Sequence, residues 1–287
     1  MKRLNAPLDS MEVSYNACTF SILDKQTRLR FEVCLPIILE LEAEYTELSK
    51  TGKSYKIAPH ENSTLVNPKI IKNVKKDELI HLYGYYMVKR KPGRNVYDRI
   101  MAAAKEECPF CGGIGITKNL DHFLPKAYFS QFSVLPVNLV PSCRDCNMEG
   151  KGSSFAKVAN EQLIHPYLDK DIIFNDQWVF ARVIDGFSDD VAIEYFVDPP
   201  AHWEEVDKER VRKHFKDFDL AKRYSLQAGG ELGGLRVQRK MFLEKFGSKE
   251  FKETVLRPVS QAKGYFINHW KRVMYKALER DLEFTKI

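Results

Sequence analysis

The sequence lacks a long apolar run. The best candidate, Cys34 to Leu41, contains Pro36 and Glu40 and is far shorter than the roughly 18 residues that cross a bilayer. The N-terminus also lacks the unbroken apolar stretch of a signal peptide, because polar residues such as Asp9 soon follow Met1-Lys2-Arg3. We therefore expect a cytoplasmic protein without a membrane partner.

Internal repeats and low-complexity segments are also missing. The 15 glycines, 13 prolines, 44% hydrophobic and 29% charged residues are close to globular averages, which excludes a disordered or collagen-like chain. At 287 residues the chain is about twice the length of one compact domain. This length predicts two lobes, or one core with appended elements.

The excess of positive charge is confined to one segment. Residues 69–99 contain nine lysines and arginines against three acids, so this stretch accounts for the whole net charge of +6. Such a cluster is typical of a surface that binds polyphosphate. A solvated helix face followed by a basic turn would give the same count, and both interpretations stay open.

Four of the six cysteines form two C-x-x-C pairs, Cys108-Pro-Phe-Cys111 and Cys143-Arg-Asp-Cys146. In a chain without a secretion signal we expect thiols to stay reduced, which favours tetrahedral zinc over disulfides. Four thiolates leave no open coordination position, so this Zn²⁺ would be structural. A redox pair or unrelated buried thiols are the alternatives. Cys18 and Cys34 have no partner motif and are expected in the core.

Residues suited to acid–base and metal chemistry lie between and after the two pairs. Asp121 precedes His122, and Asn138, Asn147 and Lys151 follow. Carboxylate and amide oxygens suit Mg²⁺, and a histidine near its ordinary pKa of about 6.5 can take a proton from water. Neighbours in a regular strand point to opposite faces, whereas a bulge or turn would bring them together. The combination predicts phosphodiester hydrolysis.

The chain order of these residues resembles the His-Asn-His (HNH) endonuclease family: the first cysteine pair, Asp121-His122, Asn138, the second cysteine pair with Asn147, and then Lys151. The similarity spans residues 108–153 and indicates the subgroup with a four-cysteine zinc knuckle. It implies a ββα-metal core of two strands and a helix. The chain departs from the family name at Asn147, where the third motif residue is histidine, and this implies a changed metal preference rather than lost activity.

The resemblance also implies a role for each residue. His122 would be the general base that activates water, and Asp121 and Asn147 would hold one catalytic Mg²⁺ or Mn²⁺. Asn138 would brace the loop through backbone hydrogen bonds, so that His122 is aimed correctly. Lys151 would meet a phosphate.

Further candidates are less specific. Lys91, Arg94 and Arg99 immediately precede the first cysteine pair and Arg144 lies inside the second, so we expect them to contact nucleic-acid phosphates, although each could be an ordinary surface charge. His165, which precedes a proline, is an additional candidate metal ligand, with a capping or core role as the alternative.

These features predict an α+β fold in three parts. Residues 1–95 would form an N-terminal mixed and helical region with the basic stretch, 96–170 the HNH core with the zinc knuckle, and 171–287 a C-terminal β-hairpin and helical lobe. Within them, periodicity predicts helices over 36–48, 67–91, 97–104 and 267–281, and a hairpin of strands 178–184 and 191–197 joined by a turn at 185–190.

The flanks resemble bacterial HNH proteins encoded beside an ATPase in Septu-type or retron-type anti-phage systems. The similar segments are Tyr97-Asp98-Arg99-Ile100 and the helix expected over 268–278. This implies an anti-phage effector with an ATPase partner that docks on the helices after residue 200.

The expected function is therefore a metal-dependent endonuclease that nicks or cuts duplex DNA. We expect relaxed sequence specificity, since no DNA-reading helix stands out. A homo-oligomer with two-fold symmetry would turn a nicking site into a double-strand cutter. RNA or tRNA cleavage, and a zinc-stabilised interaction module with an inactive site, are the alternatives.

Overall fold

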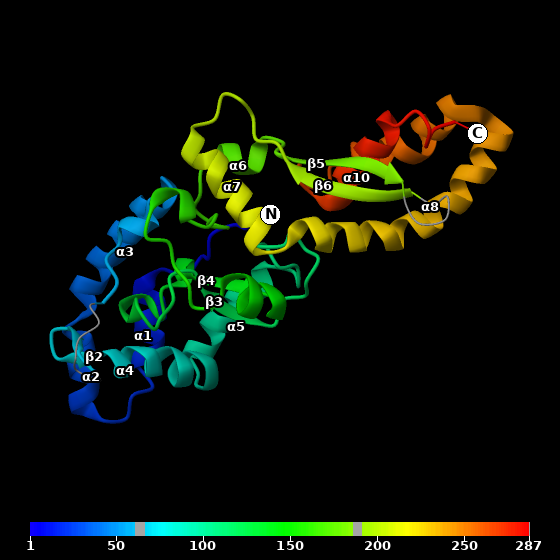
Figure 1. The fold of residues 1–287 in the computed structure, drawn as a ribbon. Helices are drawn as coiled ribbons and strands as arrows, with labels where there is room; N and C mark the ends of the chain where they lie inside the picture. The colour runs from blue at the N-terminus through cyan, green and yellow to red at the C-terminus, as the bar shows by residue number, and fades with distance from the viewer. Residues whose placement is uncertain (61–66, 186–190, 287) are drawn as a thin grey trace. The chain divides into compact units, whose positions relative to one another are not determined.

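The computed structural model describes residues 1–60, 67–185 and 191–286. The chain is a mixture of helices and short strands, which confirms the α+β class. It divides into two compact units, Arg3–Lys170 and a second unit of Met1–Lys2 with Asp171–Ile287 (Figure 1). None of the described helices combines the length and apolar character that crossing a membrane requires.

The Arg3–Lys170 unit contains mostly helices with two small antiparallel ladders. Its α-helices are α1 (Met11–Thr19), α2 (Lys25–Glu32), α3 (Leu35–Lys50), α4 (Lys76–His81) and α5 (Gly93–Ala103). Its strands are β1 (Lys69–Ile71), β2 (Val74–Lys75), β3 (Asn119–His122) and β4 (Leu139–Ser142). Shorter helical turns are 3₁₀ segments at Ser54–Lys56, Ser130–Phe132, Pro136–Asn138 and Ala159–Glu161, and π-helical segments at Leu82–Met87 and Cys146–Lys151.

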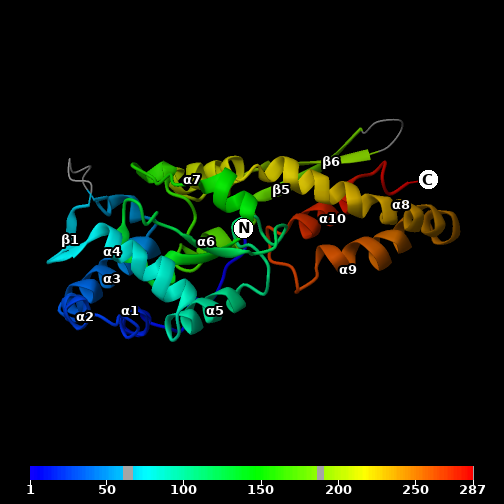
Figure 2. The same cartoon turned by 90° about the horizontal axis from the view of Figure 1, so that it is seen from below.

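Helices α1 and α2 begin at residues whose side chains accept hydrogen bonds from backbone amides of the first helical turn. The Ser10 side chain accepts a hydrogen bond from the Val13 amide at α1, and Asp24 accepts from Thr27 at α2. Helix α3 confirms the helix predicted over 36–48. Helix α1 packs against α3 and α5 (Figure 2).

The single helix predicted over 67–91 is wrong for its first part. Residues 69–75 form the β1–β2 hairpin instead, and α4 begins only at Lys76. Ile70 and Ile71 are β-branched and favour strands, and Lys72 takes a positive φ of 48° in the turn. The predicted helix over 97–104 corresponds to α5, which starts earlier, at Gly93.

Strands β3 and β4 pair antiparallel across the long loop 123–138. Asp121 lies opposite Val140 and His122 opposite Leu139, in regular register. The chain then enters the π-helical segment, which is followed by Gly152 with φ of 55°. The helical segment ends at Lys151, because the positive φ of Gly152 does not continue a right-handed helix.

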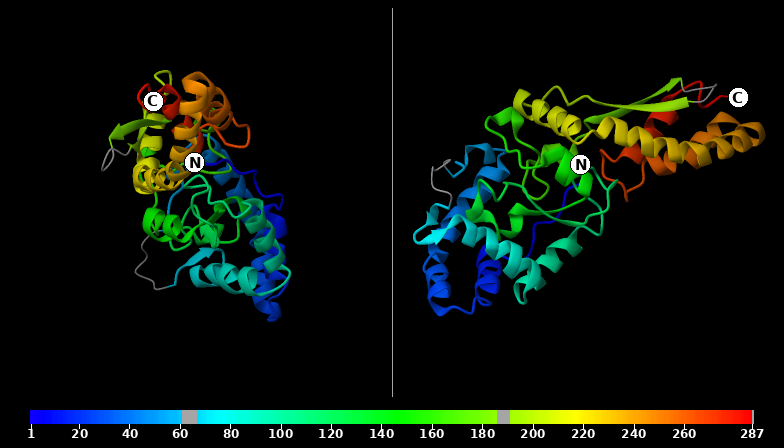
Figure 3. Two further views of the ribbon diagram at one scale, coloured as in Figure 1. Left: turned by 90° about the vertical axis from the view of Figure 1, so that its right-hand side faces the viewer. Right: turned by 60° about the horizontal axis from the view of Figure 1, so that its bottom comes forward.

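The second unit is built on the predicted hairpin. Its elements are α6 (Asp171–Asn175), β5 (Val179–Asp185), β6 (Val191–Val197), α7 (Glu205–Asp217), α8 (Leu220–Phe251), the π-helical Lys252–Leu256, α9 (Arg257–Ser260) and α10 (Trp270–Arg280). The β5–β6 pairing confirms the predicted strands, whereas residues 186–190 of the predicted turn lie outside the described residues. Helix α10 packs on β5 and α8 on β6, so the hairpin runs alongside α8 in Figures 1 and 3. Gly247, with φ of 82°, interrupts α8.

Asn268, which lies just before α10, holds the segment 176–179 that leads from α6 into β5. Its Oδ1 accepts hydrogen bonds from the amides of Trp178 (2.8 Å) and Val179 (3.0 Å), and its Nδ2 donates to the Asp176 carbonyl (2.9 Å). The side chain is buried. Three backbone groups therefore depend on one amide.

We predict that Asn268→Ala lowers the free energy of unfolding by about 3 kcal/mol, because it leaves several buried backbone groups unpaired. Urea denaturation measures this change. Asn175→Ala, at an exposed position of α6, is the matched control and should have little effect. Equal stability of both variants would show that Asn268 does not hold the unit together.

Candidate active site and metal centre

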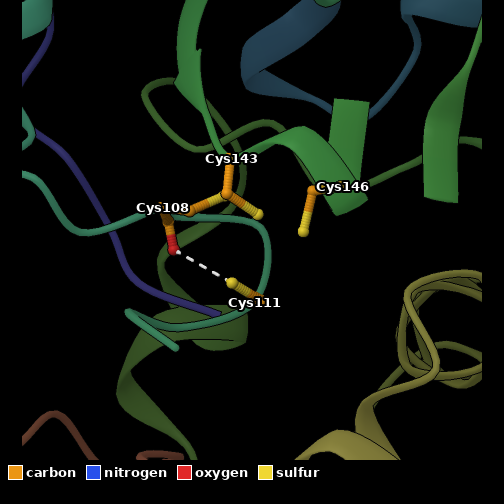
Figure 4. A group of neighbouring side chains, drawn as sticks. All are labelled: Cys108, Cys111, Cys143 and Cys146. Carbon is orange, nitrogen blue, oxygen red and sulfur yellow. Dashed lines mark hydrogen bonds between the residues drawn. The ribbon is translucent and has the colours of Figure 1, made fainter. Parts of the chain in front are cut away.

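The four paired cysteines converge in the Arg3–Lys170 unit. All are buried, and their Sγ atoms lie within 4.8 Å of one another (Figure 4). Two come from the turn that follows α5 and two from the segment that leaves β4. In a ZnS₄ tetrahedron with bonds of about 2.3 Å the sulfurs are about 3.8 Å apart, so this arrangement fits zinc with little adjustment.

The turns around the cluster are shaped for sulfur ligands. The Gly115 amide donates to Cys111 Sγ at 3.3 Å, a contact that favours a thiolate. Gly112 and Gly113 take positive φ of 67° and 92° in the same turn, where a side chain would be strained. Among the described residues this is the one cluster of three or more cysteine, histidine or acidic side chains placed to hold a metal.

We predict that Cys143→Ser reduces bound zinc from one equivalent per chain to a small fraction. The melting temperature of the protein should fall as well, because binding of the metal is coupled to folding. Metal content by mass spectrometry checks this. Cys34→Ser, also buried but outside the cluster, is the control and should keep its zinc. Full zinc content in the Cys143 variant would contradict the assignment.

His122 lies at the end of β3 and is buried. Its Nε2 lies 2.9 Å from the Ser133 carbonyl, and its ring packs edge-on against Tyr83 with centroids 4.4 Å apart. A carbonyl only accepts hydrogen bonds, so Nε2 must carry the proton. In the neutral ring the basic lone pair is therefore on Nδ1.

The pKa of His122 differs from the expectation of about 6.5. Burial, together with the Lys126 and Lys151 ammonium groups, lowers the pKa of His122 to about 3. The ring is neutral at pH 7, as a general base requires, but its basicity is weak without a neighbouring negative charge.

Asn138 holds the loop that carries Ser133. Its Oδ1 accepts from the Leu124 amide (2.7 Å), and its Nδ2 donates to the carbonyls of Leu124 and Phe132 (both 3.1 Å). The side chain is fully buried. The loop between β3 and β4 is thus fixed at both ends, and Ser133 is held against His122.

A second layer extends this network to α3 and to His165. The Tyr45 hydroxyl donates to Asn138 Oδ1 at 3.0 Å and lies 3.1 Å from His165 Nε2. His165 Nδ1 accepts from the Tyr167 amide at 3.2 Å, so Nε2 carries the proton and donates to Tyr45. Both ring nitrogens are used inside the protein. This arrangement matches the capping and core alternative for His165, and its role as a metal ligand stays a prediction.

We predict that Asn138→Ala destabilises the protein by about 4 kcal/mol, because it removes four side-chain hydrogen bonds and leaves buried backbone groups unpaired. Tyr45→Phe removes one of these hydrogen bonds and the acceptor of His165 Nε2–H, so it should cost less, about 2 kcal/mol. Chemical denaturation measures both variants. Equal effects of the two substitutions would contradict the central position of Asn138 in the network.

Asp121 and Lys151 form a buried ion pair. Asp121 Oδ2 lies 3.3 Å from Lys151 Nζ, and the two side chains are 9% and 1% exposed. The angles do not make a hydrogen bond, and Oδ2 is otherwise without a partner. Burial raises the pKa of Asp121 and lowers the pKa of Lys151, while each charge opposes the shift of the other. Lys151, expected to meet a phosphate, here meets the candidate metal ligand.

We predict that Lys151→Met costs about 3–5 kcal/mol of stability, because it leaves the Asp121 carboxylate buried without a counter-charge. Adding Asp121→Asn should recover much of this loss. A double-mutant cycle by denaturation measures the coupling. If the Lys151 variant were as stable as the wild type, the pair would not be a buried ionic interaction.

Asp121 and His122 share one electrostatic environment. The ladder has no bulge at either residue, but Lys126 and Lys151 act on the pKa values of both. Asn147 lies in the π-helical segment one turn before Lys151 and is half-buried. The structure thus pairs Asp121 with Lys151, with Asn147 on the adjoining helical segment. The bulge or turn that would bring the Asp121 and His122 side chains together does not occur in this regular ladder.

The basic residues expected on nucleic acid lie on the surface. Arg94 pairs with Asp98 at 2.8 Å, and Arg99 makes two 2.8 Å contacts with Asp9. Lys91 and Arg144 are exposed. Exposed pairs are weak and can open for a phosphate, so the predicted phosphate contacts stay predictions.

Sequence reasoning missed Tyr45, Tyr83, Lys126 and Ser133, which surround or support His122. Tyr45 precedes Asn138 by 93 residues, and no local pattern connects the two. Ser133 acts through its backbone carbonyl, so its residue type carries no signal.

Comparison with known proteins gives one family relation. No profile of a known protein family matches the chain, and no solved structure matches it. Protein ea31 of Escherichia phage lambda is 41% identical over 301 residues, an alignment that covers 100% of this chain and 99% of that protein. The chain belongs to the family of Ea31.

Proposed function

We propose that the protein is a metal-dependent phosphodiesterase of the HNH type that cleaves DNA. The observation that carries the proposal is the state of His122, whose Nε2–H is held by the Ser133 carbonyl so that Nδ1 keeps its lone pair. A carboxylate on the preceding residue and a cysteine cluster beside the same two strands accompany it.

His122 would accept the proton of the attacking water at Nδ1. The hydrogen bond to Ser133 O fixes the ring and stabilises the imidazolium that forms. A substrate phosphate adds negative charge beside the ring, which raises the pKa of His122 from its low value in the free protein. Asn138 is a positioning residue, since it acts through the loop that carries Ser133.

Asp121 and Asn147 would hold the catalytic Mg²⁺ or Mn²⁺. The buried Asp121 Oδ2 forms an ion pair with Lys151 but no hydrogen bond, so a divalent cation could replace the ammonium group as its partner. The Asn147 amide oxygen is a suitable second ligand. When bound, such an ion would neutralise the charge that develops on the phosphate and the leaving oxygen. Lys151 would then release the carboxylate and face a phosphate instead.

The Asp121–Lys151 pair also favours a second candidate, a zinc-stabilised interaction module without a catalytic metal. In that case Lys151 is the permanent counter-charge of Asp121. RNA is the alternative substrate within the first proposal. The two classes of function differ in whether any nucleic acid is cut.

The relative from a phage supports a phage-related role. We propose that the protein acts as an effector in a phage-associated defence system, with an ATPase partner, as the flanking segments suggest. Zinc in the cysteine cluster would be structural in either function.

We predict that the purified, zinc-loaded protein converts supercoiled plasmid to open-circle or linear DNA with Mg²⁺ or Mn²⁺, and that His122→Ala abolishes cleavage with zinc content unchanged. His202→Ala, whose side chain is 72% exposed in the other unit, is the matched control and should cut normally. Agarose gels measure the products.

A His122→Ala protein that cuts at the wild-type rate would contradict the role of His122. If the folded, zinc-loaded wild type cuts neither plasmid nor RNA with Mg²⁺ or Mn²⁺, this result would favour the interaction module.

A further inference from the structure

We propose that a groove beside the candidate active site binds unstacked nucleotides of a single nucleic-acid strand. The groove lies in the Arg3–Lys170 unit, between residues 55–60, Tyr128 and residues 153–157, and encloses about 870 Å³. This is within the usual size range of ligand pockets. The inference rests on the proposed nuclease function, and it names the form of substrate that this site takes.

Three aromatic rings supply stacking surfaces. Tyr55, Tyr128 and Phe155 line the groove and are each half-buried. Tyr128 and Phe155 pack on each other with centroids 5.0 Å apart and form one wall. Among the described residues Tyr55 forms no side-chain hydrogen bond or ring pair, and its ring is partly exposed. Nucleobases stack on such rings in a sequence-tolerant way.

The charge of the lining matches a phosphate backbone. Lys56 and Lys157 line the groove and are exposed, and none of its described lining residues is acidic. A cavity of about 540 Å³ in the other unit differs in this respect, since four carboxylates line it: Asp185, Glu244, Asp281 and Glu283. Arg236, Arg239 and Lys240 line that cavity as well, so its charge is mixed, whereas the charged residues that line the groove are lysines alone.

The walls of the groove start at the candidate active site. The Ser154 hydroxyl donates to the Lys151 carbonyl at 2.6 Å, and the Tyr128 amide donates to the Pro125 carbonyl at 2.9 Å. One wall is therefore the chain that leaves the helical segment of Asn147 and Lys151, and the other is the chain that leaves β3. Nucleotides next to a phosphate at His122 would enter this groove.

The third wall is fixed by His60. Its backbone amide donates to the Tyr128 carbonyl at 2.8 Å, and its Nε2 accepts from the Ser130 amide at 3.0 Å. The groove is therefore preformed, which reduces the ordering cost of binding. Paired bases in a duplex cannot reach the rings without unstacking, so the groove favours single-stranded or locally opened substrate.

The test measures binding of labelled single-stranded and duplex oligonucleotides of one sequence by fluorescence anisotropy. The full chain carries His122→Ala, and no divalent metal is added. Tyr55→Ala should weaken single-strand binding by about 5- to 100-fold, whereas Tyr55→Phe, which keeps the ring, should change it by less than about two-fold. Duplex binding should be unaffected by either substitution.

The lysines are tested by salt dependence. Lys56→Ala and Lys157→Ala should each lower the slope of log affinity against log salt for the single strand by about 0.7. Lys25→Ala, an exposed lysine outside the groove lining, is the control and should leave the slope unchanged. An unchanged slope in both groove variants would overturn the proposed phosphate contacts.

Two outcomes would overturn the groove as a single-strand site. In the first, Tyr55→Ala binds the single strand with wild-type affinity. In the second, Tyr55→Ala loses the same factor of affinity for the single strand and for the duplex. Plasmid cleavage separates this from failure of the nuclease proposal. A protein that cuts plasmid but binds single strands independently of Tyr55 keeps the nuclease and loses the groove. One that binds through Tyr55 but cuts nothing keeps the groove and loses the nuclease.

Discussion

The hydrogen bonds of the Asn138 side chain fix the geometry on which the candidate active site depends. Strands β3 and β4 are only four residues each and are joined by a long loop, so pairing alone would leave that loop free to move. Asn138 uses all its hydrogen-bonding capacity on Leu124, Phe132 and Tyr45. The fixed loop places the Ser133 carbonyl against His122. The same loop contains Tyr128, which lines the groove.

The cysteine cluster gives a second constraint on the same two strands. Cys143 follows directly after β4, and the Lys118 amide, just before β3, donates to the Ser142 carbonyl. Metal at the cluster would thus fix the ends of the strands opposite to the loop. A unit with so little sheet needs both constraints, because the ladder contributes few hydrogen bonds.

The sequence predicts what depends on residue type and short spacing. The cysteine cluster, the β5–β6 hairpin and α3 followed from C-x-x-C pairs, strand alternation and helix punctuation, and the structure confirms their placement. The prediction of one helix over 67–91 is wrong for residues 69–75, because the apolar stripe on which it depends begins only after them. Ile70 and Ile71 favour a strand instead. The partners of His122 and the ion pair of Asp121 depend on tertiary contacts, and the low pKa of His122 depends on burial, which no local pattern records.

The central claim is that water activated by His122 attacks a phosphodiester bond. Cleavage in ¹⁸O-labelled water, with mass spectrometry of the product ends, tests it most directly. The account predicts one ¹⁸O atom in each new terminal phosphate and a free hydroxyl on the opposite end. Products without the label, or ends carrying a cyclic phosphate, would contradict hydrolysis by an activated water.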